Sequence, residues 1–158
     1  MSTSLRDEIQ QTRPFTTAAE EALVNLVRTS QIVGDAGELL LKEYGLSQAQ
    51  YNVLRILRGS APAGLGRNEI RDRLITRMPD VTRLLDRMEE AGLVRRERDT
   101  TDRRCVPTYL TDKGRALVDE LDGPVRAHAE RSFGHLTAGQ LETLSALLVL
   151  VRNPPATD

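Results

Sequence analysis

The sequence predicts a mainly α-helical protein with a small two-stranded β wing, an α+β fold. Helices are indicated by three capping boxes, in which a Ser or Thr side chain accepts from a free backbone N–H and a Glu or Gln three residues later reaches back. These boxes start at Thr17, Ser47 and Thr137. The wing is indicated by two short apolar runs, at residues 93–97 and 106–110, on either side of a charged loop.

Four helices are expected before the wing. Apolar residues recur at helical spacing in each of them, and glycines mark several of their ends. The first helix is long for a globular protein and stops at Gly45, and the third has Gly66 as its N-cap. The expected helices cover residues 18–44, 48–58, 67–74 and 79–91.

The fourth helix is strongly amphipathic. Pro79 suits a first helical turn, and Gly92 ends the segment. The apolar positions that must be buried are Val81, Leu84, Leu85 and Met88. On the opposite face, Thr82 and Arg83 lie near the N-terminal end of the helix, which is where a helix that enters the major groove of DNA contacts bases.

Positive charge is concentrated in the middle third of the chain. The formal net charge is −1, but residues 55–104 contain 13 arginines, no lysine and 9 acidic residues. Arginine forks onto phosphate oxygens and guanine edges and enters narrow minor grooves. A solvated, salt-bridged helix face is the alternative interpretation. The arginine-rich loop of the wing favours duplex DNA as the partner.

The C-terminal part is expected to form two further helices. One starts at Thr111 and is kinked or broken at Gly123-Pro124, and the other covers residues 138–152. The apolar stripes of these helices and of the first helix exceed what one small winged lobe could cover. They therefore need another protein surface.

The sequence argues against an enzyme, a metal site and a membrane protein. It contains no Gly-rich phosphate loop, nucleophile elbow or zinc-protease helix, and we expect no cofactor. Two distant histidines and a single cysteine give no zinc-ligand spacing and no intramolecular disulfide. No apolar run approaches the roughly 18 residues that a membrane span needs, so a cytoplasmic protein is expected.

Three blocks at fixed spacing carry a resemblance to a known family. They are residues 81–96, which read VTRLLDRMEEAGLVRR, then Asp99 with Asp102-Arg103-Arg104, and finally Leu110-Thr111 with Gly114. In these blocks the chain resembles the MarR family of bacterial transcription regulators. The resemblance implies a winged helix-turn-helix and a homodimer that binds a pseudo-palindromic operator as a repressor and responds to a small molecule.

The resemblance also implies two intertwined lobes and a set of DNA contacts. Residues 1–45 and 112–158 would form a helical dimerisation lobe, and residues 46–111 a winged helix-turn-helix lobe. Asp102 would orient an arginine of the wing and not face DNA, because phosphates repel a bare carboxylate. The DNA contacts implied for the turn, the recognition helix and the wing are Arg77, Pro79, Thr82, Arg83, Arg87, Arg98, Arg103 and Arg104.

A small-molecule site is expected in the cleft between the first, second and fifth helices, where family members bind phenolic or carboxylated compounds. Arg28, Tyr44 and Tyr51 border this cleft in the expected fold, although both tyrosines can instead pack in the core with satisfied hydroxyls. Two other functions stay open. One is a winged-helix protein-interaction module with little DNA affinity, and the other is a redox-responsive regulator that acts through Cys105.

Overall fold

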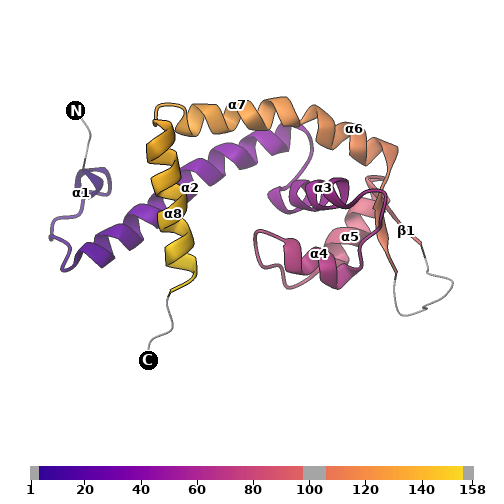
Figure 1. Cartoon of the computed structure of the whole chain (residues 1–158), viewed down its shortest axis with the longest axis horizontal. Helices are drawn as coiled ribbons and strands as arrows, with labels where there is room; N and C mark the ends of the chain where they lie inside the picture. The colour runs from indigo at the N-terminus through magenta and orange to yellow at the C-terminus, as the bar shows by residue number, and fades with distance from the viewer. Residues whose placement is uncertain (1–3, 98–105, 155–158) are drawn as a thin grey trace.

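The computed structural model describes residues 4–97 and 106–154, and its elements form two groups (Figure 1). The helical lobe consists of α1 (Leu5–Glu8), α2 (Ala18–Glu43), α7 (Asp122–Phe133) and α8 (Ala138–Arg152). The winged lobe consists of α3 (Gln48–Ser60), α4 (Arg67–Arg73), α5 (Val81–Glu90), β1 (Val94–Arg96) and β2 (Thr108–Leu110). Helix α6 (Asp112–Glu120) connects the lobes, and α7 packs alongside α2. The predicted mainly helical fold with a two-stranded wing is confirmed.

The core is centred on α3. Ser47 and Gln50 cap this helix reciprocally, and Val53 and Leu54 have no exposed surface. Helix α3 packs against α2, α4, α5, α6 and β2. The buried apolar side chains of those neighbours include Leu41, Ile70, Leu85, Met88 and Val118. Both lobes therefore share one apolar core through α3.

The wing is an antiparallel pair of short strands that is anchored on a second side. The strands pair in the register Val94 with Leu110 and Arg96 with Thr108. Thr108 also exchanges both backbone hydrogen bonds, at 2.8 and 3.0 Å, with Leu65 in the segment before α4. This additional pairing fixes the base of the wing to the start of α4.

The strands are shorter than the runs that predicted them, because their flanking residues have other roles. Gly92 ends α5 with φ +71°, and the N–H of Leu93 donates back to the Met88 carbonyl at 2.9 Å. Leu93 therefore closes the helix, and β1 begins one residue later. Pro107 has no N–H to donate, and β2 begins at Thr108.

Helix α1 was not predicted; the bounds of the other helices agree closely with the predicted ranges, and two details differ. Pro79 lies before α5 and not in its first turn, because the Asp80 carboxylate is the N-cap and accepts from the Arg83 N–H at 3.0 Å. The break expected at Gly123-Pro124 occurs at Leu121, between α6 and α7. Pro124 then lies in the first turn of α7, where its missing N–H leaves no helical hydrogen bond unmade.

Large apolar side chains are exposed on the helical lobe. Neither α7 nor α8 buries a residue, and α2 buries only Leu41. The exposed apolar side chains of α2 and α8 include Leu23, Val27, Ile32, Leu39, Leu147, Val149, Leu150 and Val151. Apolar side chains gathered in this way mark an interaction surface.

Within the described residues, no single helix is long and apolar enough to cross a membrane. Helices α6 and α7 taken together with α8 have the required length and composition only as a pair bent by 95°.

We expect Gly114→Ala to destabilise the fold. A Cβ on Gly114 would lie 2.1 Å from the carbonyl oxygen of Leu93, and Thr111 holds this approach in place by donating its hydroxyl to the Gly92 carbonyl at 2.7 Å. Because the clash is with backbone, overpacking should lower the free energy of unfolding by about 1–3 kcal/mol. Urea unfolding at one fixed protein concentration measures this change.

Gly123→Ala is the matched control, because nothing lies within 4 Å of the added Cβ. It should leave stability unchanged or raise it by up to about 1 kcal/mol. Equal unfolding midpoints for the two variants would contradict the role assigned to the Gly114 contact.

Candidate nucleic-acid interface

Helix α5 presents a polar face to solvent beside the wing. Its predicted apolar face is confirmed, with Val81, Leu84, Leu85 and Met88 all buried. Thr82, Arg83 and Arg87 are exposed. The side chain of Arg83 is 73% exposed, and its Nε lies 3.9 Å from the Asp80 carboxylate that caps the helix. An arginine placed in this way at the start of the helix can reach the edges of bases in a major groove.

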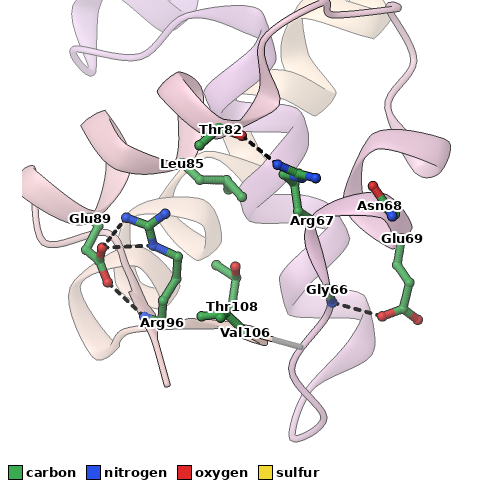
Figure 2. A pocket seen from close by; sticks show the side chains of 10 residues that line it. All are labelled: Gly66, Arg67, Asn68, Glu69, Thr82, Leu85, Glu89, Arg96, Val106 and Thr108. Atoms are coloured by element: carbon green, nitrogen blue, oxygen red, sulfur yellow. Dashed lines mark hydrogen bonds and ion pairs between the residues drawn. The ribbon is translucent and has the colours of Figure 1, made fainter. Parts of the chain in front are cut away.

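Arg67, the first residue of α4, belongs to the same surface, and the sequence interpretation did not include it. Its Nη1 donates to the Thr82 hydroxyl at 3.2 Å, which links the start of α4 to the start of α5 (Figure 2). The first helix of a helix-turn-helix crosses the DNA backbone. A basic residue at its N-terminus was therefore a usable signal for a phosphate contact.

Arg96 ties the wing to α5. Its Nε and Nη2 donate to the same Glu89 oxygen at 2.9 and 2.5 Å, and its backbone N–H donates to the other oxygen at 2.9 Å. The Nη2 atom also lies 2.7 Å from the Asp86 carboxylate. Figure 2 shows the guanidinium directed at Glu89 from the strand below. The angle between the wing and the recognition helix is therefore held by one guanidinium and two carboxylates.

This network also offsets the negative charge of two acidic residues on α5. Hydrogen bonding by Arg96 holds the pKa of Glu89 below its ordinary value, and Glu89 and Asp86 in turn raise the pKa of Arg96. Glu89 therefore stays ionised and paired, and Asp86 contacts the same guanidinium. Asp80 is engaged as the helix cap, so Asp80, Asp86 and Glu89 are all bound within the protein, and Arg83 and Arg87 provide exposed positive charge on α5.

A groove of about 740 Å³ lies between α4, α5 and the base of the wing (Figure 2). Arg67, Thr82 and Arg96 line it, together with Thr108, whose buried hydroxyl has no hydrogen-bond partner among the described residues. Side chains of α4, α5 and both strands of the wing converge here. The groove is thus concave, with Arg67 and Arg96 at two of its edges.

The structure places some of the predicted DNA-contact residues and not others. Arg77 and Pro79 are exposed in the turn that leads into α5. Arg98, Asp102, Arg103, Arg104 and Cys105 lie outside the described residues. Within residues 4–97 and 106–154, no group of three or more His, Cys, Asp or Glu side chains could hold a metal ion.

A cavity lies where the cleft was predicted, and of the three residues predicted to border it only Tyr51 lines it. A cavity of about 790 Å³ lies between α2, α3 and α7, and Tyr51 forms part of its wall. Tyr51 is also a core residue, only 6% exposed, and burial raises the pKa of its phenol. Tyr44 packs against the core elsewhere, and the Arg28 guanidinium lies 3.9 Å from Glu8. The sequence located the cleft and not its lining, because helix rotation about its axis decides which side chains face a cavity.

A short helix, an amphipathic recognition helix and an antiparallel wing together define a winged helix-turn-helix DNA-binding protein. The sequence model of the MarR family matches residues 46–106. The crystal structure of a MarR transcription factor from Planctomyces limnophilus is 41% identical, with a TM-score of 0.68, over 87% of this chain and 99% of that one. The chain belongs to the MarR family. It is a DNA-binding transcriptional regulator and not an enzyme, as the sequence predicted.

Relatives of the chain are also regulators. It is 33% identical to the uncharacterized HTH-type transcriptional regulator YkoM of Bacillus subtilis (strain 168). That alignment spans 108 residues and covers 68% of each chain. It is 43% identical over 115 residues to the HTH-type transcriptional regulator TtmR of Methylorubrum extorquens (strain PA1). That alignment covers 73% of this chain but only 55% of TtmR, so the chain spans little more than half of that relative's length.

We expect Glu89→Gln to flatten the acid dependence of stability. The pKa of Glu89 is lower in the folded protein than its ordinary value of 4.5. Its carboxylate therefore contributes stability above that value, and the contribution is lost as the pH falls through the folded pKa. Between about pH 5 and pH 3, the free energy of unfolding should fall less steeply in Glu89→Gln than in the wild type.

Urea unfolding across that pH range measures the slope. Glu90→Gln, which changes the exposed neighbouring residue on the same helix, should keep the wild-type slope. Identical slopes for Glu89→Gln and the wild type would show that the Arg96 network does not stabilise the fold.

Proposed function

We propose that this regulator is a homodimeric repressor that binds a pseudo-palindromic operator and leaves it when a small molecule binds. The observation that carries the proposal is α8, a helix of 15 residues rich in leucine and valine of which none is buried. The hydrophobic effect disfavours such a surface in water at roughly 25 cal/mol per Å² of apolar area. A second copy of the chain supplies the missing cover.

The partner surface is shared by α2 and α8. Leu23 and Val27 on α2 are 61% and 59% exposed, and Leu147 and Leu150 on α8 are 55% and 62% exposed. Both helices lie on the side of the molecule away from the wing, so a dimer formed there leaves both recognition helices accessible (Figure 1). Most closed homo-oligomers are twofold dimers, which present two identical reading surfaces to DNA.

In this proposal, the DNA contacts are assigned to three parts of the winged lobe. Thr82, Arg83 and Arg87 would enter the major groove, and Arg67, Arg77 and Pro79 would lie at its edge beside the backbone. Arg98, Arg103 and Arg104 would extend the wing into the flanking minor groove, with Asp102 as an orienting partner. The two half-sites of an operator read in this way lie about one helical turn apart.

Proteins of the same fold support the DNA and effector parts of the proposal. A mutant of MarR from E. coli, 25% identical with a TM-score of 0.73, was solved in complex with operator DNA. BpsR of Bordetella bronchiseptica is regulated in its DNA binding by 6-hydroxynicotinic acid, and CouR of Rhodococcus jostii RHA1 was solved with p-coumaroyl-CoA. In this chain, the cavity between α2, α3 and α7 would hold the effector.

The experiment that tests the proposal is fluorescence anisotropy of the full chain with duplex DNA from upstream of its own gene, compared with a shuffled duplex across a salt series. Selective binding that weakens steeply with salt supports a regulator that neutralises phosphates. Weak binding that is equal for both duplexes would overturn this choice of operator.

We expect Arg83→Ala to weaken operator binding by about 1–3 kcal/mol and to reduce sequence preference, because the variant loses a base contact in the major groove. The same anisotropy assay measures the change. Arg131→Ala, which removes an exposed arginine from α7 in the helical lobe, is the control and should bind like the wild type. Unchanged affinity in Arg83→Ala would remove this residue from the interface.

We expect the double variant Leu147→Glu and Leu150→Glu to be monomeric, since it places two carboxylates in the apolar surface that a partner would bury. Sedimentation velocity measures the assembly state. Ile75→Glu is the control, because Ile75 is also exposed, at 73%, but belongs to the winged lobe, and this variant should remain dimeric. A monomeric wild type, or a double variant that still dimerises, would contradict the proposal.

A further inference from the structure

The cavity between α2, α3 and α7 has the size and composition of a small-molecule site. Its volume of about 790 Å³ lies within the roughly 300–1,000 Å³ usual for ligand pockets. Apolar walls come from three elements, with Leu41 on α2, Val125 on α7 and the ring of Tyr51 on α3. The polar lining comes mostly from one face of α2. An amphiphilic molecule therefore has a defined orientation in this cavity.

The charge on that face is negative. Asp35 and Glu38 both line the cavity and are three residues apart, so their carboxylates lie on the same side of α2. Gln31, one turn earlier, donates from Nε2 to Asp35 Oδ1 at 2.6 Å and holds this carboxylate in place. Of the described residues that line the cavity, none is Lys or Arg.

The remaining polar groups of the lining suit a donor on the ligand. Gln48 and Thr76 provide oxygens that accept hydrogen bonds, and His128 from α7 packs against Gly37 of α2, with its Nε2 atom 3.3 Å from where a Cβ would lie. Arg28, the cation that the sequence suggested as an anchor for a carboxylate ligand, is not part of the lining. A carboxylate in this cavity would meet two like charges and no Lys or Arg side chain.

We propose that this cavity binds a protonated amine with an aromatic or aliphatic body, its ammonium group against Asp35 and Glu38 and its apolar part against Leu41, Val125 and Tyr51. The inference rests on the proposed effector response and names the chemical class of the effector. It replaces the phenolic or carboxylated class that the family resemblance implied. Charge complementarity decides between the two classes, because the apolar walls would accept either.

The same cavity touches the segment that leads to the recognition helix. Ile75 and Thr76, in the turn between α4 and α5, form part of its wall. The N–H of Ile75 donates to the Asn52 side chain at 2.8 Å, next to Tyr51 on α3. An amine that contacts this turn and α2 together couples its binding to the position of α5.

Tryptamine and indole-3-propionate are the probes, because they share an indole ring and differ in the sign of their charge. The chain contains no tryptophan, so the fluorescence anisotropy of the indole reports binding against a background of tyrosine only. With the full chain, tryptamine should bind at least about tenfold more tightly than indole-3-propionate. Its affinity should fall with added salt, because both carboxylates are exposed to solvent.

Two variants test the position of the site. Asp35→Asn with Glu38→Gln should weaken tryptamine binding about tenfold or more, whereas Glu43→Gln, which neutralises an acidic residue of α2 outside the lining, should bind like the wild type. Gly34→Leu should abolish binding, because Gly34 lines the cavity and nothing lies within 4 Å of an added Cβ. Its helical backbone accommodates the new side chain.

Equal binding of the two probes, binding of neither, or tryptamine binding that survives the Asp35→Asn, Glu38→Gln change or the Gly34→Leu change would overturn the inference. Operator affinity measured on the same preparations separates this result from the proposed function. Selective DNA binding without tryptamine binding leaves the repressor and removes the amine. Tryptamine binding without selective DNA binding leaves the amine site and removes the proposed repressor.

Discussion

The packing of α3 is the constraint on which both halves of the molecule depend. Val53 and Leu54 have no exposed surface, and the helix contacts α2 on one side and α4, α5 and β2 on the other. At its C-terminal end, Arg58 donates to Asp119 at 2.8 Å and Asp122 at 2.9 Å, which fixes the junction of α6 and α7. A close-packed interior transmits displacement. In the proposed repressor, a displacement of α2 or α7 would therefore be passed to α5 through α3.

In the winged lobe, the carboxylates near α5 hold the protein's own structure, and an arginine of the same helix stays exposed. Asp80 caps α5, and Glu89 with Asp86 holds Arg96, so these carboxylates are engaged within the protein. Arg83 remains largely exposed on the same helix. On α5 itself, the exposed cations are therefore Arg83 and Arg87, while two of the carboxylates are bound by Arg96. The net charge of −1 is compatible with DNA binding, because the arginines are concentrated in residues 55–104 and not spread over the whole chain.

The surface of the helical lobe is apolar and acidic where that of the winged lobe is basic. Exposed leucines and valines on α2 and α8 form a surface for a protein partner, whereas the cavity behind α2 has carboxylates at its edge. One helix, α2, therefore serves two surfaces. In the proposed repressor, a ligand on one face of α2 and a second subunit on another are mechanically linked, and this linkage gives the effector a route to the spacing of the two recognition helices.

The sequence by itself determined most of the helices, the capping boxes of α3 and α8, the wing and the buried face of α5, because capping boxes, glycine stops and apolar spacing are local signals. It also located the recognition helix and its exposed Thr82 and Arg83. Tertiary structure decided which of two adjacent arginines, Arg95 or Arg96, meets Glu89, because strand register sets the face of each side chain. It likewise decided that Asp35 and Glu38, and not Arg28, line the cavity. That choice depends on how α2 is rotated against α3 and α7, and no local sequence pattern encodes such a rotation.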